Sequence, residues 1–189
     1  NCKLRADLGA KIEDVNMYRS MVGSLIYLTI TRPDLSYVVG LVSQFMQQPT
    51  KPHLDCIRRI LRYVKATQNY GLFYRADLDI KLEGYTDVDW AGSQTDRRST
   101  SGYMFTLGSA AISWSSKKQA IVALSSTEAE YRGAAIATCE EVWIRRLLAD
   151  LGEYIDGAVT IWCDNMSNIQ LAKNPVFHAR TKHIEVHYH

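Results

Sequence analysis

The chain has 189 residues, of which 47% are hydrophobic and 22% charged, with a formal net charge of +2. This length and composition are typical of a folded protein with one sizeable core, or of one domain with a helical attachment, and exclude a disordered chain. The apolar stretches fall short of the roughly 20 residues that a membrane helix needs, so no membrane partner is expected. The charge is uneven, with +5 over residues 1–81 and −3 over residues 82–189.

The first part of the sequence predicts three amphipathic helices, at residues 15–29, 34–47 and 53–65. Pro33 and Pro52 precede the second and third helices, a common position for proline. In the third helix Arg58, Arg62 and Lys65 form a basic stripe on one side. This stripe fits either an ordinary solvated helix face or a surface that follows the phosphates of a nucleic acid.

From residue 81 the hydrophobic pattern changes to a period of two, which predicts strands at 81–90, 102–107, 110–115 and 121–124. Short turns join them, so we expect an antiparallel meander. A helix is predicted at 126–151, with a capping-box pattern at its start and Gly152 at its end, followed by a strand at 159–163 and a helix at 165–173. The order predicts an α/β fold with a mixed sheet flanked by helices and preceded by a small helical segment.

Four carboxylates fall in an apolar strand or at the ends of predicted elements: Asp87, Glu130, Asp164 and Glu185. A buried charge is costly unless it is paired or binds a metal, and converging carboxylates favour Mg²⁺ or Mn²⁺. A pair of such ions can drive in-line cleavage of a phosphodiester. Asp89 shares a strand face with Asp87, and Glu128 lies about 200° around the helix from Glu130. Spacing alone does not separate Asp87 from Asp89, and only one of the two glutamates can face the site.

The four cysteines, Cys2, Cys56, Cys139 and Cys163, are widely separated and lack the paired spacing of a zinc knuckle or disulfide framework. We therefore expect reduced thiols in an intracellular protein. A zinc site built from Cys163 and the C-terminal histidines 178, 183, 187 and 189 is a weaker alternative, because its one i, i+4 histidine pair is a common spacing.

Several motifs resemble the ribonuclease H domain of copia-type LTR retrotransposon polyproteins: YTDVDWAG (85–92), DRRSTSGY (96–103), ISWSSKKQ (112–119), ALSSTEAEY (123–131), WCDN (162–165) and HARTKHIE (178–185). Upstream, YRSMVGSLIYLT (18–29), TRPDL (31–35) and RILRYVK (59–65) resemble the C-terminal end of the adjoining reverse transcriptase. The resemblance implies a helical reverse transcriptase remnant at 1–75 and a ribonuclease H-like domain at 82–189.

The resemblance implies cleavage of the RNA strand of RNA:DNA hybrids by a two-metal mechanism, in a cytoplasmic retroelement particle or the nucleus. Asp87, Glu130, Asp164 and Glu185 would be the catalytic metal ligands, and His178 an auxiliary residue for product release. The family usually has Asp where this sequence has Glu185. The rest of the reverse transcriptase polyprotein is the expected partner. The chain has no Tyr-x-Asp-Asp or Phe-x-Asp-Asp polymerase motif, and the resemblance suggests that the family's last helix is truncated.

Two other functions fit parts of the pattern. A transposase or integrase also uses three carboxylates on a similar sheet, but its acidic residues come in the order Asp, Asp, Glu, whereas Glu130 precedes Asp164 here. A catalytically inactive nucleic-acid-binding remnant would keep the fold and the basic helix and lose turnover. Hybrid cleavage distinguishes this remnant from an active ribonuclease H.

Overall fold

The computed structural model describes residues 4–5, 9–76 and 81–173. The chain divides into two compact units, one formed by Asn1–Tyr74 with Gln94–Asp96, and the other by Arg75–Ser93 with Arg97–His189. We describe each unit by itself. In the described part of the chain, no helix is both long and apolar enough to cross a membrane.

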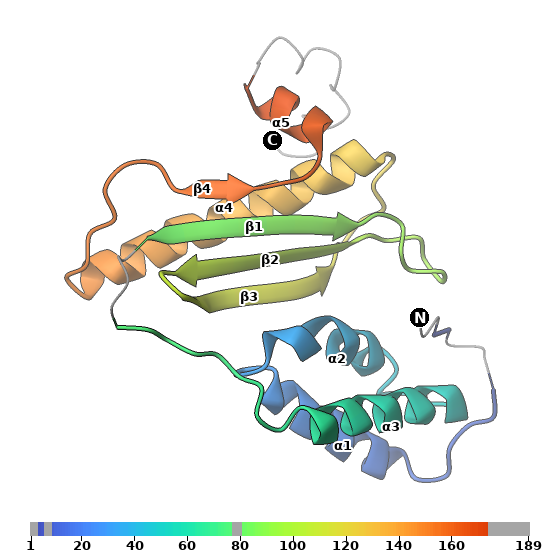
Figure 1. Ribbon diagram of the computed structural model, residues 1–189. Helices are drawn as coiled ribbons and strands as arrows, with labels where there is room; N and C mark the ends of the chain where they lie inside the picture. Colours follow the sequence, from blue (N-terminus) through green and yellow to red (C-terminus); the bar gives the residue numbers. More distant parts are fainter. Residues whose placement is uncertain (1–3, 6–8, 77–80, 174–189) are drawn as a thin grey trace. The chain divides into compact units, whose positions relative to one another are not determined.

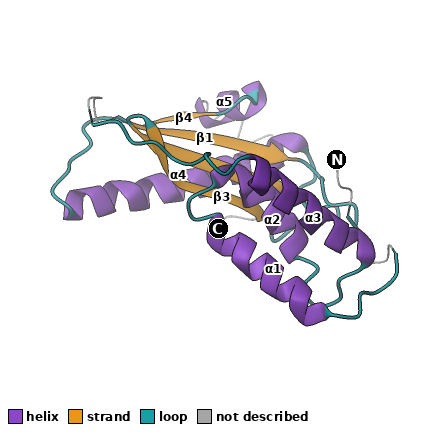
Figure 2. Ribbon diagram, turned by 60° about the horizontal axis from the view of Figure 1, so that its bottom comes forward, coloured by secondary structure: helices purple, strands orange, loops and turns teal. Residues whose placement is uncertain are grey.

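The first unit is helical, as predicted, with α1 (Val15–Leu28), the 3₁₀ turn η1 (Pro33–Leu35), α2 (Ser36–Ser43) and α3 (Lys51–Ala66). Figure 2 shows the three α-helices, whose buried apolar side chains form one core. The α3 helix begins before the predicted residue 53, because Thr50 and His53 cap its first turn reciprocally and Pro52 is tolerated there. The α2 helix ends at Ser43, before the predicted end at residue 47.

A buried arginine, Arg32, links the segment after α1 to the end of α3 through hydrogen bonds. Arg32, 4% exposed, donates to both carboxylate oxygens of Asp34 at 2.9 and 2.7 Å, and to the carbonyl and hydroxyl oxygens of Thr67 at 2.9 and 2.8 Å. These charge-assisted bonds join the segment after α1 to the end of α3. Asp34 holds the pKa of Arg32 above its ordinary value, so the guanidinium stays charged despite its burial.

The second unit contains a four-stranded sheet in the order β3-β2-β1-β4 (Figure 1). Its strands are β1 (Leu82–Asp89), β2 (Thr100–Leu107), β3 (Ala110–Lys118) and β4 (Thr160–Trp162). The first three form the predicted antiparallel meander, and β4 pairs with β1 in parallel. The predicted fold class, a mixed α/β sheet flanked by helices and preceded by a helical segment, is confirmed, and it is consistent with a ribonuclease H-like fold.

The predicted strand at 121–124 is wrong. These residues form an irregular segment that leads into α4 (Ser126–Asp150). Ala123 is buried with Val88 and Ala129, and the backbone N–H of Leu124 donates to the Glu128 carboxylate at 2.8 Å. The segment therefore packs against the start of α4 and helps to cap it. Its apolar residues are explained by these contacts and not by pairing in the sheet.

The long helix α4 covers one face of the sheet, and Figure 1 shows it running along the strands. Leu82 and Phe105 on the sheet pack with Ala137, Ile144 and Leu148 on the helix. Glycine permits a close approach, because a Cβ at Gly133 would lie 2.6 Å from Cγ2 of Val88. The helix α5 (Met166–Lys173) follows β4. Packing of α4 on β1 therefore fixes the first turn of the helix beside the C-terminal end of the strand.

Candidate metal centre

Strand β1 presents Asp87 on the face that α4 does not cover. Leu82, Gly84, Thr86 and Val88 are buried, whereas the alternate residues Tyr85, Asp87 and Asp89 are exposed. The interpretation of this run as a buried strand is therefore wrong for one of its faces, because only the other face packs on the helix. Because the Asp87 carboxylate is exposed, it does not need a buried partner for its charge. Its role therefore has to be inferred from the residues around it.

The parallel pairing of β1 and β4 puts Asp87 and Asp164 at the same end of two neighbouring strands. In the observed register Tyr85 pairs with Trp162, where β4 ends. Asp87 and Asp164 each lie two residues beyond this last pair, so both follow it toward the carboxyl ends of neighbouring strands. The carboxyl ends of the two strands lie at the same edge of the sheet, and the negative charges of both aspartates act on Glu130 there.

Glu130 enters this edge near the start of α4, four residues after the first residue of the helix, and is only 7% exposed. Its Oε2 atom has no hydrogen-bond partner. Burial, together with the negative charges of Asp87 and Asp164, raises the pKa of Glu130 from 4.5 to about 7, and a hydrogen bond from the Val88 N–H opposes this rise. The same N–H donates to Oδ1 of Asp87 at 2.8 Å. The Val88 N–H is thus shared by the carboxylates of Asp87 and Glu130, and Oε2 of Glu130 has no hydrogen-bond donor.

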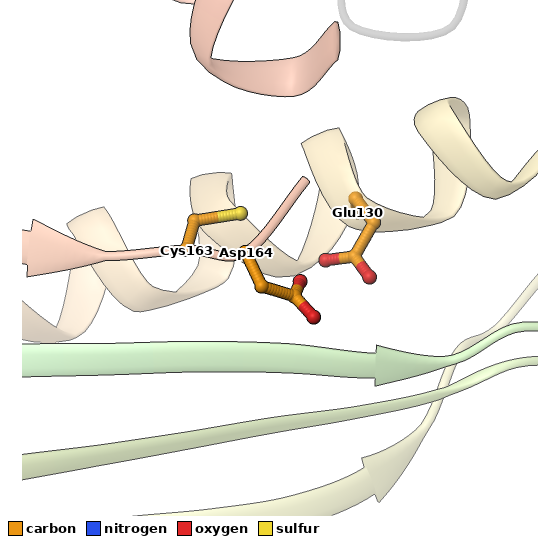
Figure 3. Close-up of side chains that lie close together, drawn as sticks. All are labelled: Glu130, Cys163 and Asp164. Atoms are coloured by element: carbon orange, nitrogen blue, oxygen red, sulfur yellow. The ribbon is translucent and has the colours of Figure 1, made fainter. Parts of the chain in front are cut away.

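Three donor atoms come close enough to share a cation. One oxygen each of Glu130 and Asp164, with Sγ of Cys163, all lie within 4.8 Å of one another. Figure 3 shows Glu130 projecting from α4 toward Asp164 and Cys163, which follow β4. Two carboxylates, with a third nearby on Asp87, are the oxygen donors that Mg²⁺ and Mn²⁺ prefer. The unpartnered buried oxygen of Glu130 makes this donor set suitable for a divalent cation.

The neighbouring acid Glu128 has a structural role that separates it from Glu130. It is 2% exposed, accepts the Leu124 N–H and pairs with Arg132 at 2.8 Å, while its own N–H donates to Ser125 at the start of the helix. Its negative charge is therefore compensated within the protein. Of the two glutamates, the structure directs Glu130 to the candidate metal centre.

Asp89 also differs from Asp87. Its carboxylate lies against Gly92, where an added Cβ would be 1.9 Å from Oδ2, in the turn that follows β1. The negative charge of Asp87 helps to raise the pKa of Glu130. The two carboxylates that spacing could not separate therefore have different surroundings, and Asp89 serves as a natural control for Asp87.

Gln119 helps to hold α4 in place, a role that the sequence analysis did not assign although the residue ends the motif ISWSSKKQ. Its Nε2 donates to Oγ of Ser101 at 2.8 Å and to the carbonyl oxygen of Ala129 at 3.0 Å, so it links β2 to the residue before Glu130. Gly133 could have been recognised, because a glycine within a helical pattern often marks a close approach.

The remaining predicted site residues fall into two groups. Glu185 and His178 lie outside the described residues, as do the other histidines of the zinc alternative, so their roles stay predictions. Arg58, Arg62 and Lys65 are exposed on α3, where Arg59 adds a fourth basic side chain that the sequence analysis missed. Arg58 pairs with Asp55 at 3.0 Å, which reduces its availability to an anion.

Comparison with known proteins identifies the family. No protein-family model and no solved structure matches the chain. It is 49% identical over 187 residues to the retrovirus-related Pol polyprotein from transposon RE1 of Arabidopsis thaliana, covering 99% of this chain and 13% of that protein. It is 46% identical over 177 residues to the corresponding polyprotein from transposon TNT 1-94 of Nicotiana tabacum, covering 91% and 13%. The chain belongs to the Pol polyproteins of copia-type retrotransposons.

This Pol segment thus spans 13% of the length of the polyproteins that it matches. The secreted RxLR effector protein 161 of Plasmopara viticola is a shorter relative, 51% identical over 128 residues, which cover 67% of the Pol segment and 90% of the effector. Similarity to the Pol segment is therefore not confined to long polyproteins. The predicted family is confirmed, whereas the activity of this segment has to be proposed from its candidate metal centre.

Proposed function

We propose that this Pol segment is a ribonuclease H-type endonuclease that cleaves the RNA strand of RNA:DNA hybrids during retrotransposon reverse transcription. The observation that carries the proposal is the buried Glu130 carboxylate, whose Oε2 has no hydrogen-bond partner and which has the charges of Asp87 and Asp164 beside it. Uncompensated negative charge of this kind is typical of a site for divalent cations.

The metal ligands in this proposal are Asp87, Glu130 and Asp164, with Glu185 as a fourth ligand that the family resemblance supplies. The expected cofactor is a pair of Mg²⁺ or Mn²⁺ ions, because the donor set is rich in carboxylate oxygen. Bound cations of this type lower the pKa of the attacking water and neutralise charge on the leaving oxygen of a phosphodiester.

The protein's own contribution is to hold the acidic groups at one edge of the sheet. The parallel pairing of β1 and β4 puts Asp87 and Asp164 at the same end of neighbouring strands, and α4 packs closely on β1 at Gly133, three residues after Glu130. The Val88 N–H donates to Asp87 and so limits its rotation. These contacts pre-orient the ligands before any cation arrives, so that less reorganisation accompanies binding.

An RNA:DNA hybrid substrate implies further roles for residues outside the candidate metal centre. RNA in a hybrid is distinguished by its 2′-hydroxyl groups, so we expect weak sequence preference. Arg58, Arg62 and Lys65, together with Arg59, would contact backbone phosphates, and His178 would assist product release. The segment would act with the rest of the Pol polyprotein, in the cytoplasmic particle of the element or in the nucleus.

The test is Mg²⁺-dependent cleavage of a labelled RNA strand paired with DNA, using duplex DNA as a negative substrate. We expect cleavage by the unmodified chain and by Asp89→Asn, and none by Asp87→Asn or Glu130→Gln, while hybrid binding persists in all four proteins. Cleavage that survives Asp87→Asn would refute the assignment. Hybrid binding without cleavage by the unmodified chain would identify a catalytically inactive nucleic-acid-binding remnant.

A further inference from the structure

A thiol lies among the carboxylates of the candidate metal centre, and the proposed function does not use it. Sγ of Cys163 is within 4.8 Å of an oxygen of Glu130 and of an oxygen of Asp164. The side chain is partly exposed, and Nδ2 of the buried Asn168 approaches the sulfur at 3.5 Å. Asn168 is held in turn by its N–H, which donates to Oδ1 of Asn165 at 2.9 Å. The sulfur is thus oriented by a fixed neighbour at the start of α5.

A second observation, on Glu130, indicates that a cation can bind beside Cys163. Oε2 of Glu130 is an unpartnered polar atom on a side chain that is more than nine-tenths buried, and Figure 3 shows the carboxylate directed at Asp164. The cysteine therefore does not stand alone. It completes a set of two oxygens and one sulfur that come from α4 and from the end of β4.

The chemistry of this set differs from that of an all-carboxylate site. Mg²⁺ takes oxygen ligands almost exclusively, whereas Zn²⁺ binds thiolate and carboxylate together in tetrahedral sites. Zn–S and Zn–O distances of about 2.3 and 2.0–2.2 Å require donors somewhat closer than 4.8 Å. The exposed Asp164 side chain can make this small movement, while burial fixes Glu130.

We propose that Cys163, Glu130 and Asp164 form a mixed sulfur and oxygen site for a thiophilic divalent cation such as Zn²⁺, which competes with Mg²⁺ for the two carboxylates. The fourth tetrahedral position is left to water. Binding forms an S–Zn bond and releases the thiol proton to solvent. The role of this cation as an inhibitor of hydrolysis rests on the proposed function, whereas its binding does not.

The experiment uses Cd²⁺ as a spectroscopic probe for Zn²⁺ and the full chain under reducing conditions. Titration with Cd²⁺ is expected to give a thiolate-to-metal charge-transfer absorption that saturates at one ion per chain and disappears in Cys163→Ser. The matched control is Cys139→Ser, which removes an exposed cysteine on α4 and should leave the absorption intact. Glu130→Gln should weaken Cd²⁺ binding by about tenfold or more, since it removes a charged ligand.

Competition separates a shared site from an isolated thiol. Added Zn²⁺ should abolish the Cd²⁺ band, and a large excess of Mg²⁺ should shift the Cd²⁺ titration to higher concentration, because the carboxylates are shared. The proposal is overturned if the band persists in Cys163→Ser or if Glu130→Gln leaves the titration unchanged. Both readouts are independent of hydrolysis. A chain that binds Cd²⁺ as expected but cleaves no hybrid would refute the proposed function and leave this inference intact.

Discussion

Replacing Glu130 by Gln is expected to stabilise the metal-free protein at neutral and alkaline pH. The unmodified side chain must ionise in a buried position near Asp87 and Asp164, with one oxygen that has no hydrogen-bond partner. Glutamine has nearly the same shape, carries no charge, and can donate its amide N–H groups to the neighbouring carboxylates. The substitution therefore removes a repulsive charge without opening a cavity.

The magnitude follows from the pKa of Glu130, which is raised from 4.5 to about 7. A rise of about 2.5 in pKa, at about 1.4 kcal/mol for each pKa unit, corresponds to an upper bound of about 3–4 kcal/mol. Between these two pKa values the folded state binds more protons than the unfolded state, so the free energy of unfolding falls as pH rises. The penalty is absent below the unfolded value of 4.5 and complete above the folded value of about 7.

The assay is urea unfolding of the full chain in chelator, compared at about pH 5 and about pH 8 for each variant. The free energy of unfolding of Glu130→Gln should exceed that of the unmodified chain by up to about 3–4 kcal/mol at the higher pH and by much less at the lower pH. Glu128→Gln is the matched control, because it breaks a buried ion pair with Arg132 and should be destabilised at both pH values. A stability difference for Glu130→Gln that does not change with pH would refute the reasoning.

Three further predictions test packing, nucleic-acid binding and metal binding. Gly133→Ala should lower the free energy of unfolding by about 1–3 kcal/mol, because the added Cβ would meet Val88. Gly23→Ala is the control: the space around Gly23 in α1 is open, so this substitution should raise the free energy of unfolding by about 0.5–1 kcal/mol. Thermal unfolding measures both. Arg62→Glu should reduce the slope of log affinity for a hybrid against log salt by about 1, with a smaller change for Arg58→Glu, since Arg58 already pairs with Asp55. Mg²⁺ should raise the melting temperature of the unmodified chain more than that of Glu130→Gln; equal shifts would contradict binding at this carboxylate.

The sheet of the second unit was predictable because its strands follow a local rule. Alternating side chains and short turns specify a meander, and the three antiparallel strands lie where the pattern placed them. The failure at residues 121–124 has a tertiary cause. Ala123 is buried because it packs on Val88, and the Leu124 N–H donates to the Glu128 carboxylate. Neither contact produces a periodic pattern in the sequence. Apolar content alone could not separate such a segment from a strand.

The sequence singled out Asp87, Glu130 and Asp164 because each falls in a strand or at the end of a predicted element, and their role as metal ligands stays a prediction. That β4 pairs with β1 in parallel, which puts both aspartates at one edge of the sheet, is known only from the structure. The choice of Glu130 over Glu128 depended on Arg132, whose position one turn further along α4 satisfies Glu128. The nearness of Cys163 depends on the path of the chain after β4, and Gln119 acts through a contact between distant segments. Such contacts require the folded structure.

Glu128 and Glu130 differ in how their negative charge is compensated, and this difference supports the proposed cation site at this edge of the sheet. They are two residues apart on one helical turn and both are buried, yet one has an ion-pair partner and the other raises its pKa to about 7. A cation present at about 100 times its dissociation constant would stabilise the fold by about 2.7 kcal/mol, which is close to the penalty worked out above. Metal binding would then offset the cost of ionising Glu130 and release its proton. Stabilisation by Mg²⁺ should therefore be larger above pH 7 than at about pH 5, and equal stabilisation at both would show that the cation binds elsewhere.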